Sequence, residues 1–425
     1  MNAMKTPDTE LPFDLLIVGG GMVGAALAAA CSGRGLRIGL TDARAPQRDW
    51  PVGEIDLRVS ALSRASQRLL ERLGQGPSVW ERILQLGASP YRDMRVWDAV
   101  GGASIHFDSA DLGEPDLGHI VENRVTQLAL WECLERSPDV QLLCPTRPAA
   151  LTLPQERKEG AQGPVSDLAR LTLGDGRSLS ARLLIGADGR DSWVRAQAGI
   201  GTSGWDYDQR AIVATVQVSE SHQATAWQRF LPTGPLAFLP LADGRCSIVW
   251  SATLDRASTL MALDDAAFRR ELEEASQRRW GGVTAVGPRA AFPLRLQHAD
   301  SYVRPRLALI GDAAHAIHPL AGQGVNLGFL DAAQLAEDLA EAQERGRDLG
   351  GLWTLRRYER ARRGDNLLML GAMDGFKRLF SNRNPLLAAA RNLGLAAVDR
   401  LGPVKRHFMA EALGLGGDLP RLARR

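Results

Sequence analysis

Apolar residues near the start of the chain fall into two short runs separated by a glycine-rich segment. Phe13 to Val18 is continuously apolar, which is typical of a buried parallel strand. Gly19 to Gly24 follows, and Ala25 to Cys31 is rich in residues that favour a helix. Leu36 to Leu40 is the second apolar run. This order predicts a β-α-β unit.

The middle of the chain alternates between helical and extended patterns. Ser60 to Leu73 has helical periodicity, and Asp139 to Cys144 reads as a strand. Gly174-Asp175-Gly176 separates two alternating runs, Leu168–Leu173 and Ser178–Ile185, so we expect a β-hairpin there.

After Trp205 the pattern becomes a series of short β-rich runs broken by proline and glycine. These runs cover residues 211–218, 226–231, 237–241 and 247–250, and an amphipathic helix is predicted for 264–277. A parallel-strand pattern returns at 307–310 and leads into a long helical region. We predict a discontinuous α/β nucleotide-binding domain of residues 1–80, 105–204 and 298–384. A β-rich domain of 81–104 and 205–297 is inserted into it, and 385–425 forms a helical C-terminal segment.

Composition restricts the class of protein. The 425 residues are 45% hydrophobic, enough for two domains, and 51 basic against 49 acidic residues do not favour a nucleic-acid partner. The four cysteines are scattered without C-x-x-C spacing, which indicates a reduced, cytoplasmic setting. Glycines break the apolar stretch 15–30, and the first ten residues lack a signal-peptide core. We expect a soluble or peripheral protein.

The first candidate motif is Gly19-x-Gly21-x-x-Gly24, placed between the first predicted strand and helix. Glycine permits a tight turn and a close approach to pyrophosphate, and the helix N-terminus that follows favours an anion. Asp42 ends the second strand, where a carboxylate can accept hydrogen bonds from ribose hydroxyls. The unit is suited to NAD or FAD.

Two later motifs follow predicted strands in the same way. Gly186-Ala187-Asp188-Gly189-Arg190-Asp191-Ser192 would by itself be compatible with an ordinary turn. The longer motif runs from Gly311-Asp312 through His315, His318 and Pro319 to Gly328. Asp312 is suited to ribityl hydroxyls, and a helix that starts near Val325 would direct its N–H groups at an electron-rich carbonyl. His315 and His318 lie one helical turn apart, but the chain has no further ligand cluster, so we expect structural roles and no metal.

Together the three motifs resemble those of the class A flavoprotein monooxygenases, the aromatic-hydroxylase family with the fold of p-hydroxybenzoate hydroxylase. Other segments are similar to the ubiquinone-biosynthesis hydroxylases of the UbiH, UbiI and UbiF type. These segments are Arg58–Leu62, Leu117–Asn123, Pro319–Gly328, Arg357–Arg360, Phe376 with Leu379–Ser381, and Arg391–Leu395. The resemblance extends from about Phe13 to Leu415.

The resemblance implies a Rossmann-like FAD-binding domain with an inserted β-rich substrate domain and a helical C-terminus. It also implies roles for individual residues around FAD. The ADP half would be held by Gly19, Gly21, Gly24, Asp42 and Arg124. Arg58 would lie near the cofactor, Asp188 would support its binding, and Asp312 would bind the ribityl chain. The isoalloxazine ring would be lined by Pro319, Gly322, Gly324, Val325 and Asn326. Asp42 is a departure, because many relatives carry glutamate there.

The activity implied is that of an NAD(P)H- and O₂-dependent aromatic hydroxylase acting in ubiquinone biosynthesis. In this family NAD(P)H reduces FAD, O₂ adds to form a C4a-hydroperoxyflavin, and oxygen is transferred to a polyprenylated phenol or benzoquinol ring. No catalytic side chain is expected, only the flavin-adjacent loop with Pro319, Gly322 and Gly324. Two alternatives stay open: a hydroxylase of another small aromatic compound, and a non-catalytic FAD-binding subunit of a quinone-synthesis assembly.

The segment Pro385 to Leu415 mixes apolar residues with arginine and lysine. A basic amphipathic helix of this kind can rest on a membrane surface, where a polyprenyl substrate would be found. Packing against the domain or against a partner protein explains the pattern equally well. We therefore expect a cytoplasmic protein, for which contact with the inner membrane and association with a quinone-biosynthesis complex both stay open.

Overall fold

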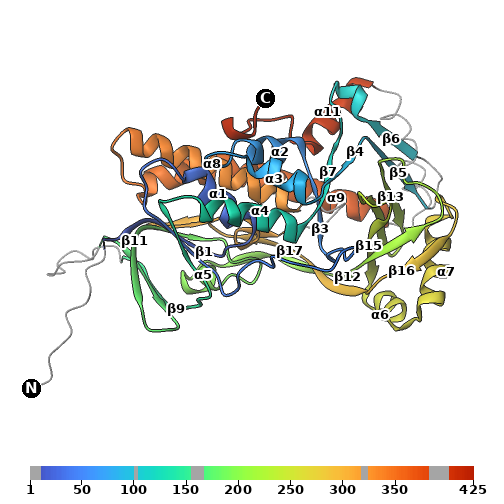
Figure 1. Ribbon diagram of the computed structural model, residues 1–425, viewed down its shortest axis with the longest axis horizontal. Helices are drawn as coiled ribbons and strands as arrows, with labels where there is room; N and C mark the ends of the chain where they lie inside the picture. Colours follow the sequence, from blue (N-terminus) through green and yellow to red (C-terminus); the bar gives the residue numbers. More distant parts are fainter. Residues whose placement is uncertain (1–10, 100–103, 155–166, 317–323, 382–401) are drawn as a thin grey trace, which may run out of the picture.

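The eight-stranded sheet carries the predicted nucleotide-binding unit. The computed structural model describes residues 11–99, 104–154, 167–316, 324–381 and 402–425. The strand order is β18-β19-β11-β1-β2-β8, with β10 paired to β11 and β9 to β10 (Figure 1). Strands β19, β11, β1, β2 and β8 pair in parallel. The bounds are β1 Phe13–Val18, β2 Ile38–Thr41, β8 Val140–Leu143, β9 Pro148–Thr152, β10 Ala169–Leu173, β11 Ser178–Gly186, β18 Val303–Arg304 and β19 Leu307–Leu309.

Three helices pack together beside this sheet. Helix α1 (Met22–Cys31) contacts both α4 (Asn123–Glu135) and α8 (Gly324–Glu344). Five alanines in α1 are buried, and their small side chains let both neighbours approach closely. The short helix α5 (Trp193–Gln197) follows β11.

The nine-stranded sheet is distinct from the first, as the change of pattern after Trp205 predicted. Its order is β20-β17-β12-β15-β14-β13-β5-β6, with β16 paired to β12. The bounds are β5 Asp93–Asp98, β6 Ser104–Asp108, β12 Thr202–Val218, β13 Thr225–Leu231, β14 Gly234–Pro240, β15 Cys246–Thr253, β16 Val283–Val286, β17 Ala290–Ala299 and β20 His315–Ala316. Helices α6 (Leu254–Ala262) and α7 (Asp265–Ser276) pack on one of its faces, where Trp250 and Phe268 are fully buried.

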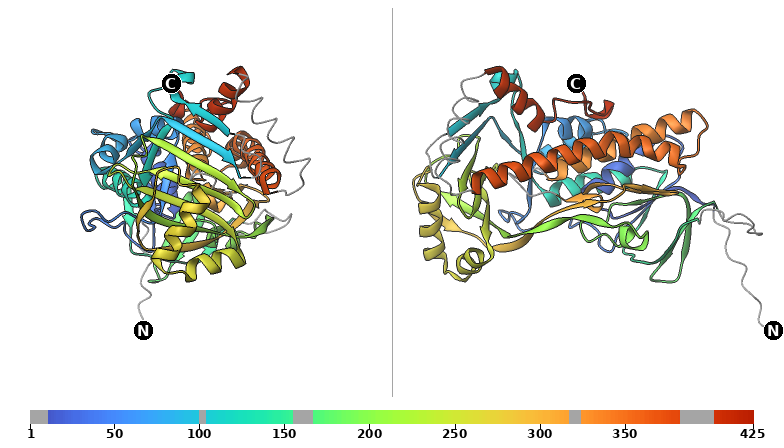
Figure 2. Two further views of the ribbon diagram at one scale, coloured as in Figure 1. Left: turned by 90° about the vertical axis from the view of Figure 1, so that its right-hand side faces the viewer. Right: turned by 180° about the vertical axis from the view of Figure 1, so that it is seen from behind.

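A smaller sheet and its helices lie between the two large sheets. It consists of β3 (Val59–Leu62), β7 (Gly118–Glu122) and β4 (Ser89–Tyr91) in that order. The neighbouring helices are α2 Arg64–Glu71, α3 Val79–Leu86, η1 Ser109–Leu112, α11 Gly402–Ala412 and η4 Arg421–Ala423. Helix α9 (Leu352–Ser381) contacts β18 at one end of the molecule and β13 at the other. Figure 2 shows it running along the back beside α8. With 30 residues it is about 45 Å long, so it ties the two large sheets together.

The predicted elements are largely confirmed, including the β-α-β unit, the hairpin and the helix that starts near Val325. The predicted helix over Ser60–Leu73 is wrong at its start, because Val59–Leu62 forms β3 and pairs with β7. The helix begins only after Ser63, whose hydroxyl accepts a hydrogen bond from the Ser66 N–H. Pairing with a strand some 60 residues away cannot be seen in local periodicity. The domain boundaries stay a prediction.

Among the described residues, no helix is both long enough and apolar enough to cross a bilayer.

Candidate functional site

Five parallel strands end at one edge of the eight-stranded sheet. Four of them, β1, β2, β11 and β19, lead into the first motif, Asp42, the second motif and the third motif. Backbone hydrogen bonds continue the sheet into these loops. The Gly19 N–H donates to Thr41 O at 2.8 Å, the Ala187 N–H to Val18 O at 2.8 Å, and the Ile310 N–H to Gly186 O at 3.0 Å. Parallel sheets bind ligands beyond the carboxyl ends of their strands, so the three motifs form one candidate site.

The first motif is closely packed on one side and open on the other. A Cβ atom on Gly19 would lie 2.3 Å from Ala187 O, and one on Gly24 would lie 2.0 Å from Gly19 O, so neither position admits a side chain. A Cβ on Gly21 would meet no described atom within 4 Å. The open side of the turn is therefore at Gly21.

The amino end of α1 is available to an anion. No side chain caps Gly21, and its carbonyl accepts the first helical hydrogen bond, from the Ala25 N–H. The N–H groups of residues 22–24 therefore have no acceptor within the helix. Together with the helix dipole, they form a site suited to pyrophosphate.

Asp42 lies directly beside the glycine turn. Its Oδ2 accepts from the Gly20 N–H at 2.7 Å, and its Oδ1 accepts from the Arg44 N–H at 2.9 Å. The Gly20 carbonyl in turn accepts from Trp131 Nε1 at 2.7 Å and Gln127 Nε2 at 3.0 Å. The turn and its carboxylate are held in place by α4, as a ribose-binding role for Asp42 requires.

Asp188 organises the loop on which it lies. Its Oδ1 accepts from the Ser192 hydroxyl at 2.5 Å, and its Oδ2 accepts from the Val194 N–H at 3.0 Å. Both bonds stabilise the start of α5. Any support that Asp188 gives to a cofactor therefore acts through the shape of this loop.

Arg195 connects the second motif to the third and was missed in the sequence. The residue is only 9% exposed, and its guanidinium donates to Ala313 O at 2.8 Å and to Arg190 O at 2.9 Å. An arginine next to a turn reads as a surface residue, and only the tertiary structure reveals that it is buried.

The third motif is seated on helix α1 through Val23. A Cβ on Gly311 would lie 3.2 Å from Val23 Cγ1, and one on Gly328 would lie 2.6 Å from Val23 Cγ2. Gly311 also has a φ of +59°, which favours glycine. Two glycines thus let α8 and the preceding loop lie against the first motif.

Asp312 lies in this loop, in the turn that follows β19. Its side chain remains exposed to solvent although protein surrounds it on most sides. Burial raises the pKa of the Asp312 carboxyl, while the charges of His315, Arg190 and Arg58 act in the opposite direction. Arg58, an exposed residue, therefore lies near Asp312, and its guanidinium is 6.0 Å from the centre of the Phe292 ring.

Arg124 is engaged by two carboxylates. Its Nη1 donates to Glu54 Oε1 and its Nε to Glu122 Oε2, both at 2.9 Å, and its guanidinium lies 4.4 Å from the centre of the Trp50 ring. Arg124 precedes Gln127 by one turn of α4 and so lies on the helix that holds the glycine turn. Its predicted contact with the ADP half remains a prediction, which would require the half-exposed Glu54 to give way.

Asn326 joins the start of α8 to the small sheet. Its Oδ1 accepts from the Ser63 N–H at 3.1 Å and the Ser66 hydroxyl at 2.7 Å, and its Nδ2 donates to Ala61 O at 2.9 Å. Gly324 and Val325 form the first turn of the same helix. Pro319, Gly322 and His318 lie outside the described residues, and the flavin-facing role of the whole loop stays a prediction.

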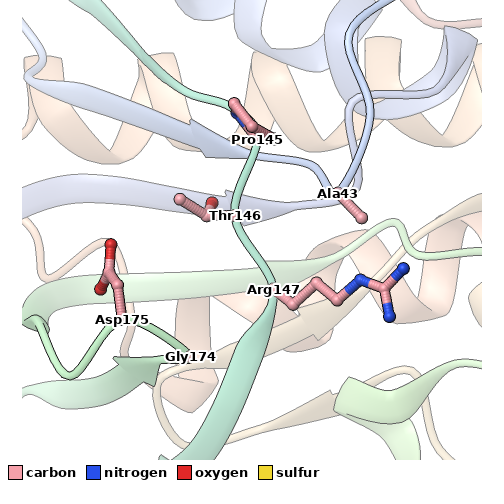
Figure 3. Close-up of a pocket in the computed structure, with 6 residues that line it drawn as sticks. All are labelled: Ala43, Pro145, Thr146, Arg147, Gly174 and Asp175. Atoms are coloured by element: carbon pink, nitrogen blue, oxygen red, sulfur yellow. The ribbon is translucent and has the colours of Figure 1, made fainter.

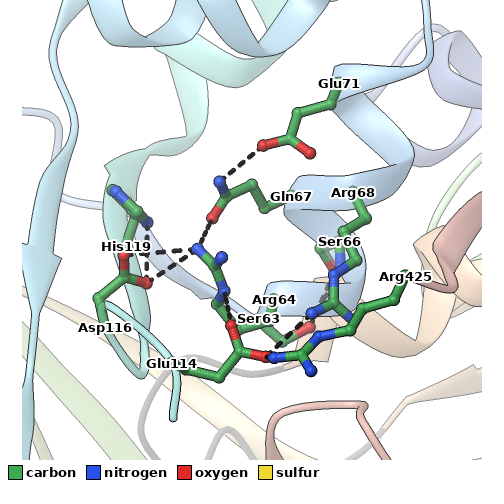
Figure 4. Close-up of polar contacts among 10 residues, drawn as sticks. All are labelled: Ser63, Arg64, Ser66, Gln67, Arg68, Glu71, Glu114, Asp116, His119 and Arg425. Atoms are coloured by element: carbon green, nitrogen blue, oxygen red, sulfur yellow. Dashed lines mark hydrogen bonds and ion pairs between the residues drawn. The ribbon is translucent and has the colours of Figure 1, made fainter. Parts of the chain in front are cut away.

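An ion cluster braces α2 behind these contacts (Figure 4). The Glu114 side chain is 3% exposed and forms ion pairs with three arginines. The N–O distances are 3.2 Å to Arg64, 3.0 Å to Arg68 and 2.6 Å to Arg425. Arg64 also pairs with Asp116 at 3.2 Å. Because the guanidinium groups surround a buried carboxylate, α2 is held firmly where Ser63 and Ser66 bind Asn326.

A second buried network lies beneath the third motif and was also missed in the sequence. Asp331 is fully buried; it accepts from the Gly311 N–H and Arg362 Nε at 3.0 Å each, and lies 2.5 Å from His315 Nε2. Burial alone would raise the pKa of Asp331, but the charges of His315 and Arg362 hold it below its usual value. This pairing supports a structural role for His315.

The same network extends through Asn366 to Tyr302 and His298. Asn366 Nδ2 lies 3.3 Å from Tyr302 Oη, which is 3.0 Å from His298 Nε2. Burial and the charges of His315 and Arg363 lower the pKa of His298 to about 4. No group of metal-ligating residues occurs in the described part of the chain.

A cavity of about 250 Å³ adjoins the Asp42 end of the site (Figure 3). Ala43, Pro145, Thr146, Arg147, Gly174 and Asp175 line it. The Thr146 N–H donates to Asp42 O at 2.8 Å, so the cavity and the carboxylate belong to neighbouring loops.

These features fit FAD. The uncapped amino end of α1 and the open side of Gly21 suit the phosphate groups of a dinucleotide, and carboxylates after two different strands, Asp42 and Asp312, suit ribose and ribityl hydroxyls.

Comparison with known proteins gives the same result. Residues 13–366 match the family described as FAD binding domain. Ubiquinone hydroxylase UbiL of Rhodospirillum rubrum is 44% identical, and the alignment covers 97% of this chain and 92% of the relative. The 3-demethoxyubiquinol 3-hydroxylase of Escherichia coli is 41% identical over 96% of this chain and all of the relative. The human mitochondrial ubiquinone biosynthesis monooxygenase COQ6 is 37% identical, and the alignment covers 95% of this chain and 93% of the relative.

Solved structures share the fold at lower sequence identity. The p-nitrophenol 4-monooxygenase PnpA of Pseudomonas putida superimposes with a TM-score of 0.75 at 20% identity, covering 96% of this chain and 99% of that one. PqsL of Pseudomonas aeruginosa in complex with 2-aminobenzoylacetate superimposes with a TM-score of 0.70 at 23% sequence identity. The superposition covers 88% of this chain and 98% of PqsL. At these identities the likeness bears on the fold alone.

Substitution of Gly24 by alanine tests the packed side of the turn. The new methyl group would overlap Gly19 O, so we expect a loss of stability of about 1–3 kcal/mol or more and a preparation without bound FAD. Gly364→Ala in helix α9 is the matched control, because a Cβ there meets no described atom within 4 Å. It should retain FAD and gain up to about 1 kcal/mol. Absorbance spectra and thermal unfolding measure both; a yellow, fully stable Gly24→Ala protein would contradict the packing.

The buried His298 makes stability depend on pH. Its pKa is about 4 in the folded protein, against an ordinary value of about 6.5 in the unfolded chain. Between these two pH values His298 binds a proton in the unfolded chain but not in the folded protein. The contribution of neutral His298 to the free energy of unfolding is therefore complete above about pH 6.5 and is lost as the pH falls towards about 4. His298→Gln, which keeps a group for the Tyr302 hydroxyl, should reduce this dependence. Calorimetric unfolding midpoints that fall equally with pH in both proteins would disprove it.

Proposed function

We propose that this chain, which belongs to the FAD-binding-domain family and within it to the ubiquinone-biosynthesis hydroxylases, hydroxylates the ring of a polyprenylated phenol or benzoquinol. The chain is an FAD-dependent monooxygenase with NAD(P)H as co-substrate. One observation carries the choice of substrate: hydroxylases named for ubiquinone and demethoxyubiquinol align with it along nearly its whole length.

FAD, when bound, supplies the electron transfer and the activation of O₂ that side chains cannot provide. The chain's own groups bind and orient it. The free N–H groups at the start of α1 would receive the pyrophosphate, Asp42 would accept from a ribose hydroxyl, and Asp312 from a ribityl hydroxyl. The amino end of α8, at Gly324 and Val325, would direct N–H groups and a positive dipole at the ring.

The remaining requirement is a dry, shaped space for the substrate ring. Productive oxygen transfer needs the ring held near the reacting centre and water kept away from it. The apolar residues that the nine-stranded sheet turns toward β3 and β7 supply a suitable wall, including Ala226 and Leu239. Asn326, Asp331 and Arg195 hold the backbone on the opposite side, so we assign them positioning roles.

A polyprenyl tail would bring the enzyme to a membrane surface or to a partner that delivers the tail. We propose contact of the segment 385–415 with the inner membrane, from its mixed apolar and basic residues. Residues 385–401 lie outside the described residues. In the described remainder, Met409 and Leu413 are buried in the protein and Lys405 pairs with Asp111 at 3.1 Å. The candidate contact is therefore concentrated in 385–401, and assembly with other quinone-biosynthesis proteins is the alternative route to substrate.

Turnover measurements test the chemistry. A prenylated phenol such as 2-geranylphenol should accelerate NAD(P)H oxidation by the FAD-loaded protein and yield a product heavier by one oxygen atom. Mass spectrometry under ¹⁸O₂ should place the label in that product. A non-prenylated phenol as the better substrate would favour another aromatic hydroxylase. Bound FAD without turnover on either compound would favour the non-catalytic subunit.

Liposome flotation tests the membrane contact. The full chain should float with anionic vesicles, and the Arg391→Glu/Arg400→Glu double variant should remain in the dense fraction, since each basic residue near an anionic surface contributes about 1 kcal/mol. Arg177→Glu/Arg345→Glu, at two arginines that are more than half exposed elsewhere, is the control and should float normally. Equal flotation of all three proteins, or of none, would exclude the proposed contact.

A further inference from the structure

We propose that Gln228 recognises an oxygen substituent on the substrate ring, as the polar element of an otherwise apolar binding face. The inference rests on the proposed function and adds a specificity-determining residue to it. Gln228 lies in the middle of β13 and is only 4% exposed. Its Oε1 is buried and has no hydrogen-bond partner in the described structure. Burying an amide in this way is costly unless a ligand completes its hydrogen bonding.

The strand register fixes which face of the sheet carries Gln228. Gln228 pairs with Ala237, Ala237 with Val249, and Val249 with Val213; on the other side Gln228 pairs with Val96. Cross-strand partners share a face, so these residues form one row across the sheet. Gln228 is the polar member of this row of aliphatic side chains.

This face points toward the flavin side of the molecule. Ala226 lies two residues before Gln228 in β13 and therefore on the same face. Ala226 and Leu239 pack in one buried cluster with Ala61 of β3. The carbonyl of Ala61 accepts the hydrogen bond from Asn326, at the start of α8. A short chain of contacts thus connects the neighbourhood of Gln228 to the predicted isoalloxazine-binding turn.

Other buried polar groups of this domain also lack a hydrogen-bond partner among the described residues. Trp250 and Trp280 also have indole N–H groups without a partner among the described residues, but both belong to the core cluster on the opposite face, under α6 and α7. Ser251 shares the face of Gln228 and also has an unpartnered hydroxyl, in the adjacent row. Ser251 is thus a second polar position on the same face, two strands away from Gln228.

The face is not completely filled by protein. Val249 lies on the central strand β15, between the buried Val213 and Ala237, yet it keeps partial solvent exposure. Val249 packs partly against the cluster containing Ala61 and partly against the cluster containing Leu370 of α9. A central strand residue with solvent access indicates space between these clusters, in the row of Gln228 and two strands away from it.

An amide suits the ring that a quinone-synthesis hydroxylase would meet. Its carbonyl can accept from a phenolic hydroxyl, and its NH₂ can donate to a neighbouring ring oxygen. A site built around a buried acceptor discriminates strongly against an analogue that lacks the donor, because the acceptor is then left unpaired. The aliphatic row on both sides of Gln228 would contact the ring faces and the prenyl chain.

The test compares two ligands on two proteins, both loaded with FAD. The probes are 2-geranylphenol and geranylbenzene, which lacks the ring oxygen, and binding is followed by perturbation of flavin absorbance. Gln228→Met, which keeps the length of the side chain but removes its polar atoms, should weaken binding of the phenol about 10- to 100-fold and leave geranylbenzene unchanged. Gln217→Met is the matched control near the end of strand β12 in the same sheet, where Nε2 already bonds to Val218 O. It should change neither affinity.

The possible outcomes separate the inference from the proposed function. If the wild type hydroxylates 2-geranylphenol and Gln228→Met binds and hydroxylates it equally well, the inference fails and the proposed function stands. If the wild type neither binds nor hydroxylates the phenol, the proposed function itself fails. Gln228→Leu provides a second variant should the methionine protein lose FAD. A loss of affinity that is the same for both probes, in whichever variant keeps FAD, would show a structural role for Gln228 and overturn the proposal.

Discussion

Close contact between backbone segments is the constraint on which this structure depends. At Gly19 and Gly24 the turn after β1 touches the loop after β11 and its own carbonyl so closely that a single methyl group would not fit. At Gly311 and Gly328 the loop after β19 and helix α8 close around Val23 in the same way. Three distant segments can share one cofactor site only because glycine removes the side chains between them. The candidate site is therefore built from main chain, and side chains serve mainly to hold that main chain in place.

Two buried polar systems do most of this holding. Asp331 on α8 forms hydrogen bonds with Gly311, His315 and Arg362, and so connects the third motif to helices α8 and α9. Glu114 pairs with three arginines, two of which, Arg64 and Arg68, belong to α2. Buried carboxylates are stable only when charges or donors surround them, and here the partners come from separate elements. Each network therefore ties separate elements together, and these ties support the loops of the candidate site.

The nine-stranded sheet divides its two faces between stability and binding. One face packs aromatic side chains such as Trp250 and Phe238 under α6 and α7, where complete burial stabilises the sheet. The other face carries smaller side chains toward β3, β7 and α9, with Gln228 among them. Because the face under α6 and α7 already stabilises the sheet, the face toward β3, β7 and α9 can be packed less tightly. This division is the reason why we propose the same strands both as core and as a wall of the substrate site.

The sequence by itself determined the local units of this protein. Phe13–Val18, the glycines that follow and Asp42 are read from neighbouring residues, because strand periodicity, turn chemistry and helix start signals act over short distances. The separate β-rich region and the third motif were recognisable for the same reason. Only the tertiary structure decided that Ser60–Leu62 is a strand, that Arg195 and Asp331 are buried connectors, and that Gln228 faces the candidate site. These outcomes depend on partners that are distant along the chain, and burial, pairing and the unmet hydrogen bond of an amide exist only once the chain has folded.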